Sequence, residues 1–302
     1  MGLDALTYYA FRLAGAAAPH IPLRLGYRIG AQLGTLAYLL SGSRAVVEDN
    51  IAHVLREPPS SPRVRRAVRQ IFLNQGKNYF DLLRVAALDS EAIKGAVREL
   101  HGMEHLERAL AHGRGVVLAS AHFGNIDVAG QIIAVMGYTL TAIAEHLRPE
   151  RLFQYVRAQR ESHGLHFIPI DGSLRPVFRA LQRNEIVATA LDRNTTDEGR
   201  VVEFFGEPAR LPDGYLRLAL RTGAALVVGF SRRLADDTYA VTVEPEVELQ
   251  RSGNLEQDIQ VNMRRVLSIW ETYLERYPEQ WVLFQPVWLS RLPASAIEET
   301  TG

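Results

Sequence analysis

The stretch Gly115–Gly130 reads GVVLASAHFGNIDVAG and contains, in order, a strand-like run, a turn and the beginning of a helix. The apolar run Val116–Ser120 is typical of a buried strand, and a helical pattern begins at about Asn125. Strands that lead through short turns into helices are the building units of α/β proteins. The stretch therefore predicts an α/β fold with this strand inside the sheet.

The turn after this strand contains a histidine and a carboxylate, His122 and Asp127, with Gly124 between them. On one continuous helix, residues at i and i+5 lie ~140° apart and do not meet. They meet if His122 ends the strand, Gly124 permits a tight bend and Asp127 lies in the first helical turn. We therefore predict that Asp127 hydrogen-bonds one ring nitrogen of His122 and leaves the other nitrogen free as a base.

Beyond this turn, strand-like and helix-like segments alternate along the chain. The predicted strands are 138–144, 166–169, 186–191, 201–205 and 225–230, with a further strand within 236–247. The predicted helices beyond the turn are 149–163, 173–183, 213–222 and 255–276, and those before it are 43–55, 62–87 and 102–112. Such alternation favours right-handed crossovers and parallel pairing. The predicted fold class is α/β, with a mixed, largely parallel central sheet flanked by helices and preceded by an N-terminal helical arm.

Polar residues follow two other predicted strands. Glu145 comes after the strand that ends at 144, and Asp192 and Arg193 come after the strand that ends at 191. Ligands of open α/β sheets bind at the carboxyl ends of the strands. We therefore expect these residues to lie beside His122 at one edge of the sheet. This grouping indicates a functional site there.

Two further segments are candidates for ligand binding. Arg160 shares a face of the predicted helix 149–163 with Arg157. Its guanidinium can reach a phosphate at the sheet edge, or it can stay solvated and paired with neighbouring glutamates. Phe204 and Gly206 belong to the segment FFG, which predicts either an apolar wall with a closely approaching backbone or a part of the core.

The composition excludes several classes of protein. The chain has 302 residues and a formal net charge of zero, which argues against a nucleic-acid-binding protein. It has no cysteine, so disulfides, thiol nucleophiles and cysteine metal sites are excluded, and its scattered histidines do not predict a metal. Nearly all of its 34 basic residues are arginine, which fits either a compositional bias or a set of phosphate-binding guanidiniums.

The segment 1–42 is rich in leucine, alanine and tyrosine, and prolines divide it into two predicted helices, 3–18 and 22–41. Its longest uncharged stretch, Ile29–Gly42, is shorter than the ~20 residues of a membrane span. No basic region precedes the apolar part, which argues against a secretory signal. We predict two amphipathic helices that lie on a membrane surface; packing of both helices on the globular core is the alternative.

Several motifs resemble the glycerolipid acyltransferase superfamily. AHFGNID resembles its motif of a histidine followed, after four residues, by an acid. That motif alone is weak, but it occurs with VVEDNIAHVL, AEHLRPERLFQYVRAQRESHG, LDRN, VEFFGEPARLPDGYLRLALRTGA and YPEQWVLFQPVW. Together they resemble the bacterial glycolipid branch, the lipid A biosynthesis (lauroyl/myristoyl) acyltransferases and the phosphatidylinositol mannoside acyltransferases. The resemblance covers residues 25–290, and the AEHLRPERLFQ and WVLFQPVW blocks lean toward the mannoside enzymes.

The resemblance implies a glycerol-3-phosphate acyltransferase-like fold and a reaction. An acyl group moves from an acyl thioester, acyl-CoA or acyl carrier protein, to a hydroxyl of a membrane glycolipid, without a metal or other cofactor. His122 is then the general base, and Asp127 orients it and stabilises the imidazolium. The expected substrate contacts are Glu145, Arg160, Asp192, Arg193, Phe204 and Gly206.

The residues and this resemblance together predict the organisation of the chain. Residues 1–42 are expected to form membrane-associating helices, 43–290 an acyltransferase domain and 291–302 a flexible tail. The expected location is the cytoplasmic face of the cell membrane, where the protein is peripheral or anchored by its N-terminal helices.

Two other functions remain open from the sequence. An ester hydrolase could use the same His122 and Asp127, but no Gly-x-Ser-x-Gly motif is present and Ser120 is the only hydroxyl nearby. A non-catalytic lipid-binding protein could keep the fold, although the intact pair of His122 and Asp127 counts against it. Release of free fatty acid, or lipid binding that does not depend on His122, would identify these alternatives.

Overall fold

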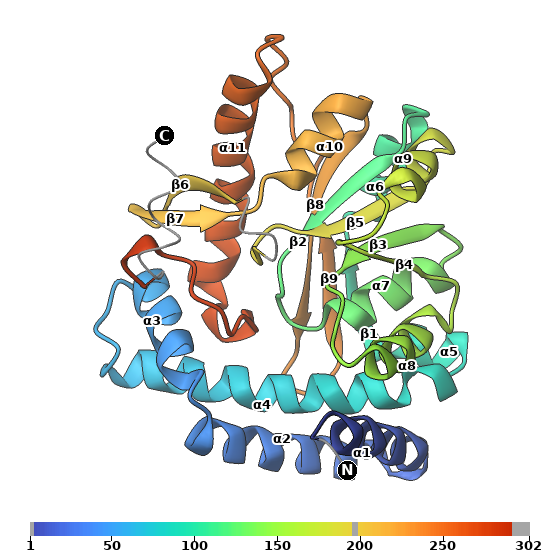
Figure 1. Ribbon diagram of the computed structural model, residues 1–302, viewed down its shortest axis with the longest axis vertical. Coiled ribbons are helices and arrows are strands. Elements are labelled where there is room, and N and C mark those ends of the chain that lie inside the picture. Colours follow the sequence, from blue (N-terminus) through green and yellow to red (C-terminus); the bar gives the residue numbers. More distant parts are fainter. Residues whose placement is uncertain (1–2, 195–198, 292–302) are drawn as a thin grey trace.

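The computed structural model describes residues 3–194 and 199–291, and Figure 1 shows its central sheet with helices on both faces. The strands are β1 (Val97–His101), β2 (Val116–Ser120), β3 (Leu140–Ala144), β4 (His166–Pro169), β5 (Ile186–Ala190), β6 (Arg200–Phe204), β7 (Glu207–Leu211), β8 (Ala225–Arg233) and β9 (Tyr239–Val243). The α-helices are α1 (Leu3–Ala17), α2 (Leu23–Leu40), α3 (Arg44–Leu55), α4 (Pro62–Arg84), α5 (Ser90–Ala96), α6 (Met103–Ala111), α7 (Ile126–Val135), α8 (Glu150–Glu161), α9 (Arg175–Gln182), α10 (Gly214–Thr222) and α11 (Leu255–Arg276).

Within the described residues, seven strands form one sheet in the order β1-β9-β8-β2-β5-β3-β4. The five strands from β8 to β4 are parallel, whereas β9 runs antiparallel to β8 and carries β1 parallel to itself. The predicted α/β fold with a mixed, largely parallel sheet is therefore confirmed. Strand β2 lies in the middle, and its first four residues are buried, as its continuous apolar run predicts.

The sheet separates two hydrophobic cores. On one face, Val116 and Leu118 of β2 pack with residues of α6 and α7, such as Leu106 and Ile133. On the other face, the alternate residues of the same strand join a larger core that includes α3, α4, α9, α10 and α11. This division follows from the alternation of side chains along a strand.

Several elements of the fold differ from the sequence prediction. The predicted strand 201–205 is β6, but it pairs with β7 in a separate antiparallel hairpin outside the main sheet. Phe205 and Gly206 form its two-residue loop, and both have positive φ (53° and 81°), as a type I′ turn requires. The edge strand β1 was not predicted, because its half-exposed sequence VRELH lacks an apolar run.

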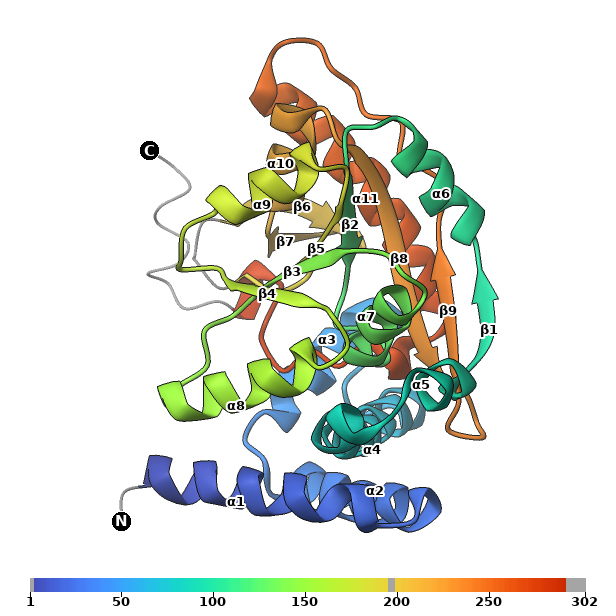
Figure 2. The same cartoon turned by 90° about the vertical axis from the view of Figure 1, so that its right-hand side faces the viewer.

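Helices α1 and α2 form an outer layer beside α4 and α8, which Figure 2 shows from the side. Helix α2 lies against α4 through a stripe of three glycines, Gly26, Gly30 and Gly34. A Cβ atom on Gly30 would lie 2.7 Å from the carbonyl oxygen of Gly76 in α4, so only glycine permits this approach. None of the described helices is both long and apolar enough to cross a bilayer.

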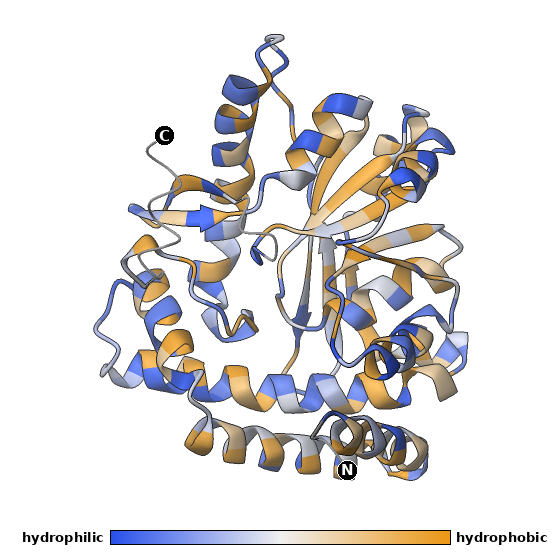
Figure 3. Ribbon diagram, in the orientation of Figure 1, coloured by the Kyte–Doolittle hydropathy of each residue, from blue (hydrophilic) through white to orange (hydrophobic). Residues whose placement is uncertain are grey.

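The opposite face of this layer is apolar and exposed. Figure 3 shows hydrophobic residues recurring along α1 and α2. The exposed side chains are Leu6, Tyr9 and Leu13 on α1, and Leu23, Leu25, Ile29, Leu33, Leu36, Leu39 and Leu40 on α2. We call this set the outer apolar stripe. Of the predicted flexible tail 291–302, residues 292–302 lie outside the described residues.

Candidate active site

A cavity of about 650 Å³ opens at the carboxyl ends of β2, β5 and β3. Its walls are mostly aliphatic, with Leu118, Ile133 and Leu140 from one core and Val177 and Leu218 from the other. Its polar lining includes His122, Asp127, Glu145, Arg160 and Arg193. The three strand ends that were predicted to converge therefore meet at this one cavity.

His122 is held by the carboxylate of Asp192. The Nδ1 atom of His122 lies 2.9 Å from Oδ1 of Asp192, and the backbone N–H of His122 donates to Oδ2 at 2.8 Å. Both residues follow neighbouring parallel strands, β2 and β5, which places them side by side. Among the described residues no hydrogen bond is made by Nε2 of His122, so this nitrogen is left to accept a proton.

The predicted pairing of His122 with Asp127 is therefore wrong. Asp127 lies in the first turn of α7, as predicted, but its carboxylate faces α8, where Nε of Arg160 lies 2.7 Å from Oδ1. A second guanidinium nitrogen of Arg160 donates to Oδ2 at 3.2 Å. The carboxylate of Asp192, at the end of the adjacent strand, reaches both Nδ1 and the backbone N–H of His122. The carboxylate of Asp127 makes neither contact.

Asp192 was also predicted to contact substrate, and its position excludes this. The residue is only 2% exposed, and its Oδ2 also accepts a hydrogen bond of 3.0 Å from Nε1 of Trp281. It lies behind the imidazole, outside the cavity lining. Asp192 can therefore act on a reaction only through His122.

The environment of Asp192 keeps it ionised. Burial alone would raise its pKa, but the charge of a protonated His122 and the hydrogen bonds from His122 and Trp281 outweigh burial and hold the pKa below its ordinary value of 3.8. An ionised carboxylate only accepts hydrogen bonds, so it fixes the proton of the neutral imidazole on Nδ1. Nε2 is then the basic nitrogen.

This lowered pKa predicts how stability depends on pH. A carboxyl whose pKa is lower in the folded state stabilises the fold above its unfolded pKa, and this contribution is lost as the pH falls through the folded pKa. We expect the unfolding free energy of wild type to exceed that of Asp192→Asn near neutral pH. We expect this difference to shrink below about pH 4. Denaturant titrations between about pH 3 and 6 measure this, and a difference independent of pH would contradict it.

The turn that carries His122 is fixed by its backbone. Gly124 has a φ of +64°, and a Cβ atom there would lie 2.0 Å from the carbonyl oxygen of Ser231. The carbonyl of His122 accepts a hydrogen bond from the N–H of Val282, and the N–H of Gly124 donates to the carbonyl of Gln280. The bend expected at Gly124 is thus present, and a segment after α11 braces it.

Two ion pairs lie at the cavity. Arg160 binds Asp127, and Arg193 binds Glu145, which follows β3. All four side chains are partly exposed, by 21% to 37%. They therefore offer both cations and hydrogen-bond acceptors to a polar group that enters beside His122.

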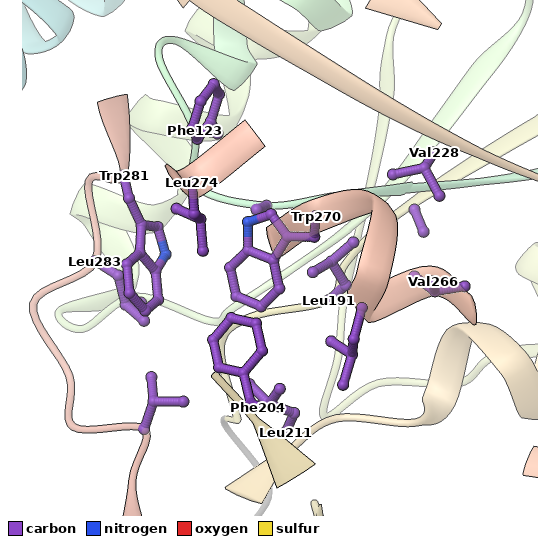
Figure 4. Packing of buried hydrophobic residues seen from close by; sticks show 14 of the residues in the cluster. Phe123, Leu191, Phe204, Leu211, Val228, Val266, Trp270, Leu274, Trp281 and Leu283 are labelled. Atoms are coloured by element: carbon purple, nitrogen blue, oxygen red, sulfur yellow. The ribbon is translucent and has the colours of Figure 1, made fainter. Parts of the chain in front are cut away.

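The other two predicted contact residues lie elsewhere. Phe204 is fully buried and stacks between Trp270 and Trp288, with ring centroids 4.6 and 5.5 Å away; Figure 4 shows its packing beside Trp270. Gly206 is exposed in the β6–β7 turn, with open space around it. The alternative that this segment belongs to the core is correct for Phe204, because the ring is enclosed by aromatic neighbours.

Sequence reasoning missed two aspects of this site. It placed Asp192 at the correct sheet edge but did not recognise it as the partner of His122, although its position after the neighbouring strand was a usable signal. It did not assign Trp281 to the site, because 89 residues separate the indole from Asp192. Within residues 3–194 and 199–291, no cluster of three or more histidine or acidic side chains could hold a metal ion.

Comparison with known proteins identifies the class of this protein. The family model described as bacterial lipid A biosynthesis acyltransferase matches residues 3–290, so the chain belongs to this family. A phosphatidylinositol mannoside acyltransferase of Mycobacterium tuberculosis is 30% identical over 299 residues, which cover 95% of this chain and 89% of that protein. The protein is therefore an acyltransferase, as the motifs predicted.

Two further relatives belong to the two branches of the resemblance. The phosphatidylinositol mannoside acyltransferase of Mycolicibacterium smegmatis is 30% identical over 256 residues, covering 83% of this chain and 82% of the relative. A lipid A biosynthesis acyltransferase of Haemophilus influenzae is 22% identical over 264 residues, covering 87% of this chain and 81% of the relative.

Proposed function

We propose that this acyltransferase moves a fatty acyl group from an acyl thioester, acyl-CoA or acyl carrier protein, to a hydroxyl of a membrane glycolipid, with His122 as the general base. The observation that carries the proposal is the imidazole of His122, fixed by a buried carboxylate at a cavity with aliphatic walls. Such a cavity accommodates an acyl chain, and the imidazole meets its polar end.

The proposed reaction needs only groups of the chain and its substrates. Nε2 of His122 removes the proton of the acceptor hydroxyl while the hydroxyl oxygen attacks the thioester carbonyl. The new C–O bond forms and the C–S bond breaks, and the leaving thiolate takes the proton from the imidazolium, which restores neutral His122. Asp192 stabilises that imidazolium, and no resident cofactor or metal is required.

The negative charge that develops on the carbonyl oxygen needs a donor. Arg160 and Arg193 both line the cavity and carry permanent positive charge. Each is paired with a carboxylate that is itself partly exposed, so a substrate oxygen would share the guanidinium with that carboxylate or replace it. We assign the two guanidiniums to the oxyanion and to anionic groups of the acceptor, and Asp127 and Glu145 to hydroxyl groups of the acceptor head.

The acceptor that we favour is a phosphatidylinositol mannoside-like lipid. Relatives named for that activity share 30% identity with the chain, whereas the named lipid A relative shares 22%. The direct test incubates the purified protein and labelled palmitoyl-CoA with vesicles that contain either a mannoside lipid or an under-acylated lipid A. We expect acylated mannoside lipid as the product; transfer only to lipid A would overturn this choice of acceptor.

The same assay separates transfer from hydrolysis. The hydroxyl of Ser120 donates to the carbonyl of Ala121 and not to His122, which does not favour a serine nucleophile. We expect thioester consumption to depend on the acceptor lipid. Free fatty acid formed at the same rate without acceptor would identify a hydrolase, and binding of lipid without any turnover would identify a non-catalytic protein.

We further propose that the protein binds the cytoplasmic face of the cell membrane through the outer apolar stripe of α1 and α2. Acyl thioesters are made in the cytoplasm, and the glycolipid acceptor resides in the membrane. The glycines of α2 face α4, so the leucines of α2 face away from the globular part. This arrangement supports helices that lie flat on the lipid surface while α2 stays packed on α4.

Charged substitutions in this stripe are expected to weaken membrane binding. Ile29 and Leu33 are 43% and 61% exposed. Replacing either with glutamate removes an apolar side chain that the lipid would bury and puts a charge in its place. We expect ~10-fold weaker binding to anionic vesicles for each substitution, measured by sedimentation. Leu100→Glu on β1, where the leucine is 39% exposed, is the matched control. Equal losses in the control and the stripe variants would contradict the assignment.

A further inference from the structure

A buried polar cluster contacts the His122 turn at Asn125. Its centre is Asp81 of α4, whose carboxylate accepts hydrogen bonds from Tyr27 (2.8 Å), Arg233 (2.7 Å), Asn125 (3.2 Å) and Tyr239. None of these five residues is more than 8% exposed. They come from α2, α4, β8, β9 and the turn after β2, so the cluster joins parts of the chain that are distant in sequence.

The charges of the cluster are paired, although Nε and Nη1 of Arg233 make no hydrogen bond within the described residues. Arg233 neutralises the charge of Asp81, and its guanidinium carbon lies 5.0 and 4.8 Å from the ring centroids of Tyr27 and Tyr239. A buried carboxylate with an ion pair and several donors is well compensated, but loss of one partner leaves the others unsatisfied. We therefore expect the arrangement to resist displacement of any member.

Asn125 connects this cluster to the catalytic turn. Its side-chain oxygen caps α7 by accepting from the N–H of Val128, while its amide nitrogen donates to Asp81 and Tyr239. Its backbone N–H and carbonyl both bond the hydroxyl of Ser231. Asn125 is only three residues after His122, so its position fixes the direction in which the turn delivers the imidazole to Asp192.

A second contact reinforces this connection. Asn78 of α4 donates to the carbonyl of Gly124 at 2.6 Å, and its own side-chain oxygen accepts from Arg233 at 2.8 Å. The same guanidinium thus holds both Asp81 and Asn78. Residues 124 and 125 are consequently attached to α4 at two adjacent points.

Tyr27 extends the connection to the outer helices. It lies on α2 beside Gly26, in the face that packs on α4. Its hydroxyl is the contact between α2 and Asp81, and its ring is in edge contact with Phe80. A helix that carries the outer apolar stripe on its other face therefore reaches the catalytic turn through only two side chains, Asp81 and Asn125.

We propose that Asp81 is a positioning residue for acyl transfer, which holds the His122 turn through Asn125 and couples that turn to the seating of α2 through Tyr27. The predicted changes in kcat rest on the proposed role of His122 as the base. The predicted changes in the His122–Asp192 contact do not depend on that role. It predicts that small changes on α2 or α4, which touch neither substrate nor His122, alter the His122–Asp192 contact.

The test compares Asp81→Asn and Tyr27→Phe with wild type. The first keeps the size of the side chain and removes its charge; the second removes one hydroxyl and is expected to leave the protein folded. Asp258→Asn is the matched control, because Asp258 is also buried and bonds the N–H and hydroxyl of Ser252, far along the chain from the turn. All three are measured for thermal stability, for kcat and KM, and for the Nδ1 proton resonance of His122, assigned by its absence in His122→Gln.

We expect kcat to fall ~10- to 100-fold in Asp81→Asn and a few-fold in Tyr27→Phe, with KM within a factor of ~2, because a displaced base misses its geometry while binding is kept. The Nδ1 proton resonance is expected to shift or broaden in both variants. Asp258→Asn should lose stability without either change. An unchanged resonance and unchanged kcat in folded Tyr27→Phe and Asp81→Asn would overturn the proposal.

The two levels of the inference fail separately. If His122→Ala retains full activity, the proposed function fails, yet a shifted His122 resonance in Tyr27→Phe still supports the positioning role. If His122→Ala is inactive and the resonance stays unchanged in both cluster variants, the positioning role fails and the proposed function stands.

Discussion

Replacing His122 with alanine is expected to lower kcat for acyl transfer by about 10³- to 10⁴-fold, because the acceptor hydroxyl then has no base to take its proton. Alanine removes the imidazole but leaves the backbone N–H that donates to Asp192, so the turn keeps its bond of 2.8 Å. The fold is therefore expected to survive, and circular dichroism with a thermal melt would verify it. The measurement is the rate of labelled acyl transfer at saturating donor and acceptor.

His112→Ala is the matched control for this experiment. His112 follows α6, and its Nε2 lies 2.9 Å from Glu246 on the surface. It lies outside the cavity lining, so the control should transfer at the wild-type rate. Wild-type activity in His122→Ala, with either donor thioester, would remove His122 from the reaction.

Replacing Asp192 with asparagine is expected to cost about 10³-fold in kcat through the tautomer of His122. The amide oxygen can still accept from Trp281 and from the backbone N–H of His122, which leaves the NH₂ group facing Nδ1. Nδ1 must then accept, the proton moves to Nε2, and the nitrogen that should act as the base is blocked. Substrate binding is expected to change little, because Asp192 lies outside the cavity.

Asp127→Asn distinguishes the observed partner of His122 from the predicted one. This substitution weakens the ion pair with Arg160 and leaves the bond between His122 and Asp192 in place. The nitrogen chemical shifts of labelled His122 should therefore report the wild-type tautomer in Asp127→Asn and the opposite tautomer in Asp192→Asn. The reverse pattern would restore Asp127 as the orienting residue.

Local sequence patterns predicted most of the elements of this fold. Strand β2 and helix α11 have their predicted bounds, because a continuous apolar run and a long helical period are strong signals. The alternation of strands and helices also predicted that Glu145, Asp192 and Arg193 would gather at one edge of the sheet. These predictions needed only the direction of the chain, not the order of the strands.

The partners within the site required the strand order. Which carboxylate reaches His122 depends on β5 lying next to β2 in register, with Ser120 opposite Ala190. The sequence distance instead favoured Asp127, which is nearer along the chain but turned toward α8. Similarly, the sequence does not distinguish whether Phe204 lines a cavity or belongs to the core, because the two tryptophans that enclose its ring come from distant segments.

The glycine contact between α2 and α4 has a practical consequence for producing the protein. Deleting residues 1–42 to improve solubility would uncover Phe72, Gly76 and Phe80 along α4 and leave Asp81 without the hydroxyl of Tyr27. The shortened chain would then expose the apolar face of α4 to solvent, and water would reach the ion pair of Asp81 and Arg233. Surface redesign of the outward leucines, with the glycines untouched, is the route that preserves the fold for crystallisation.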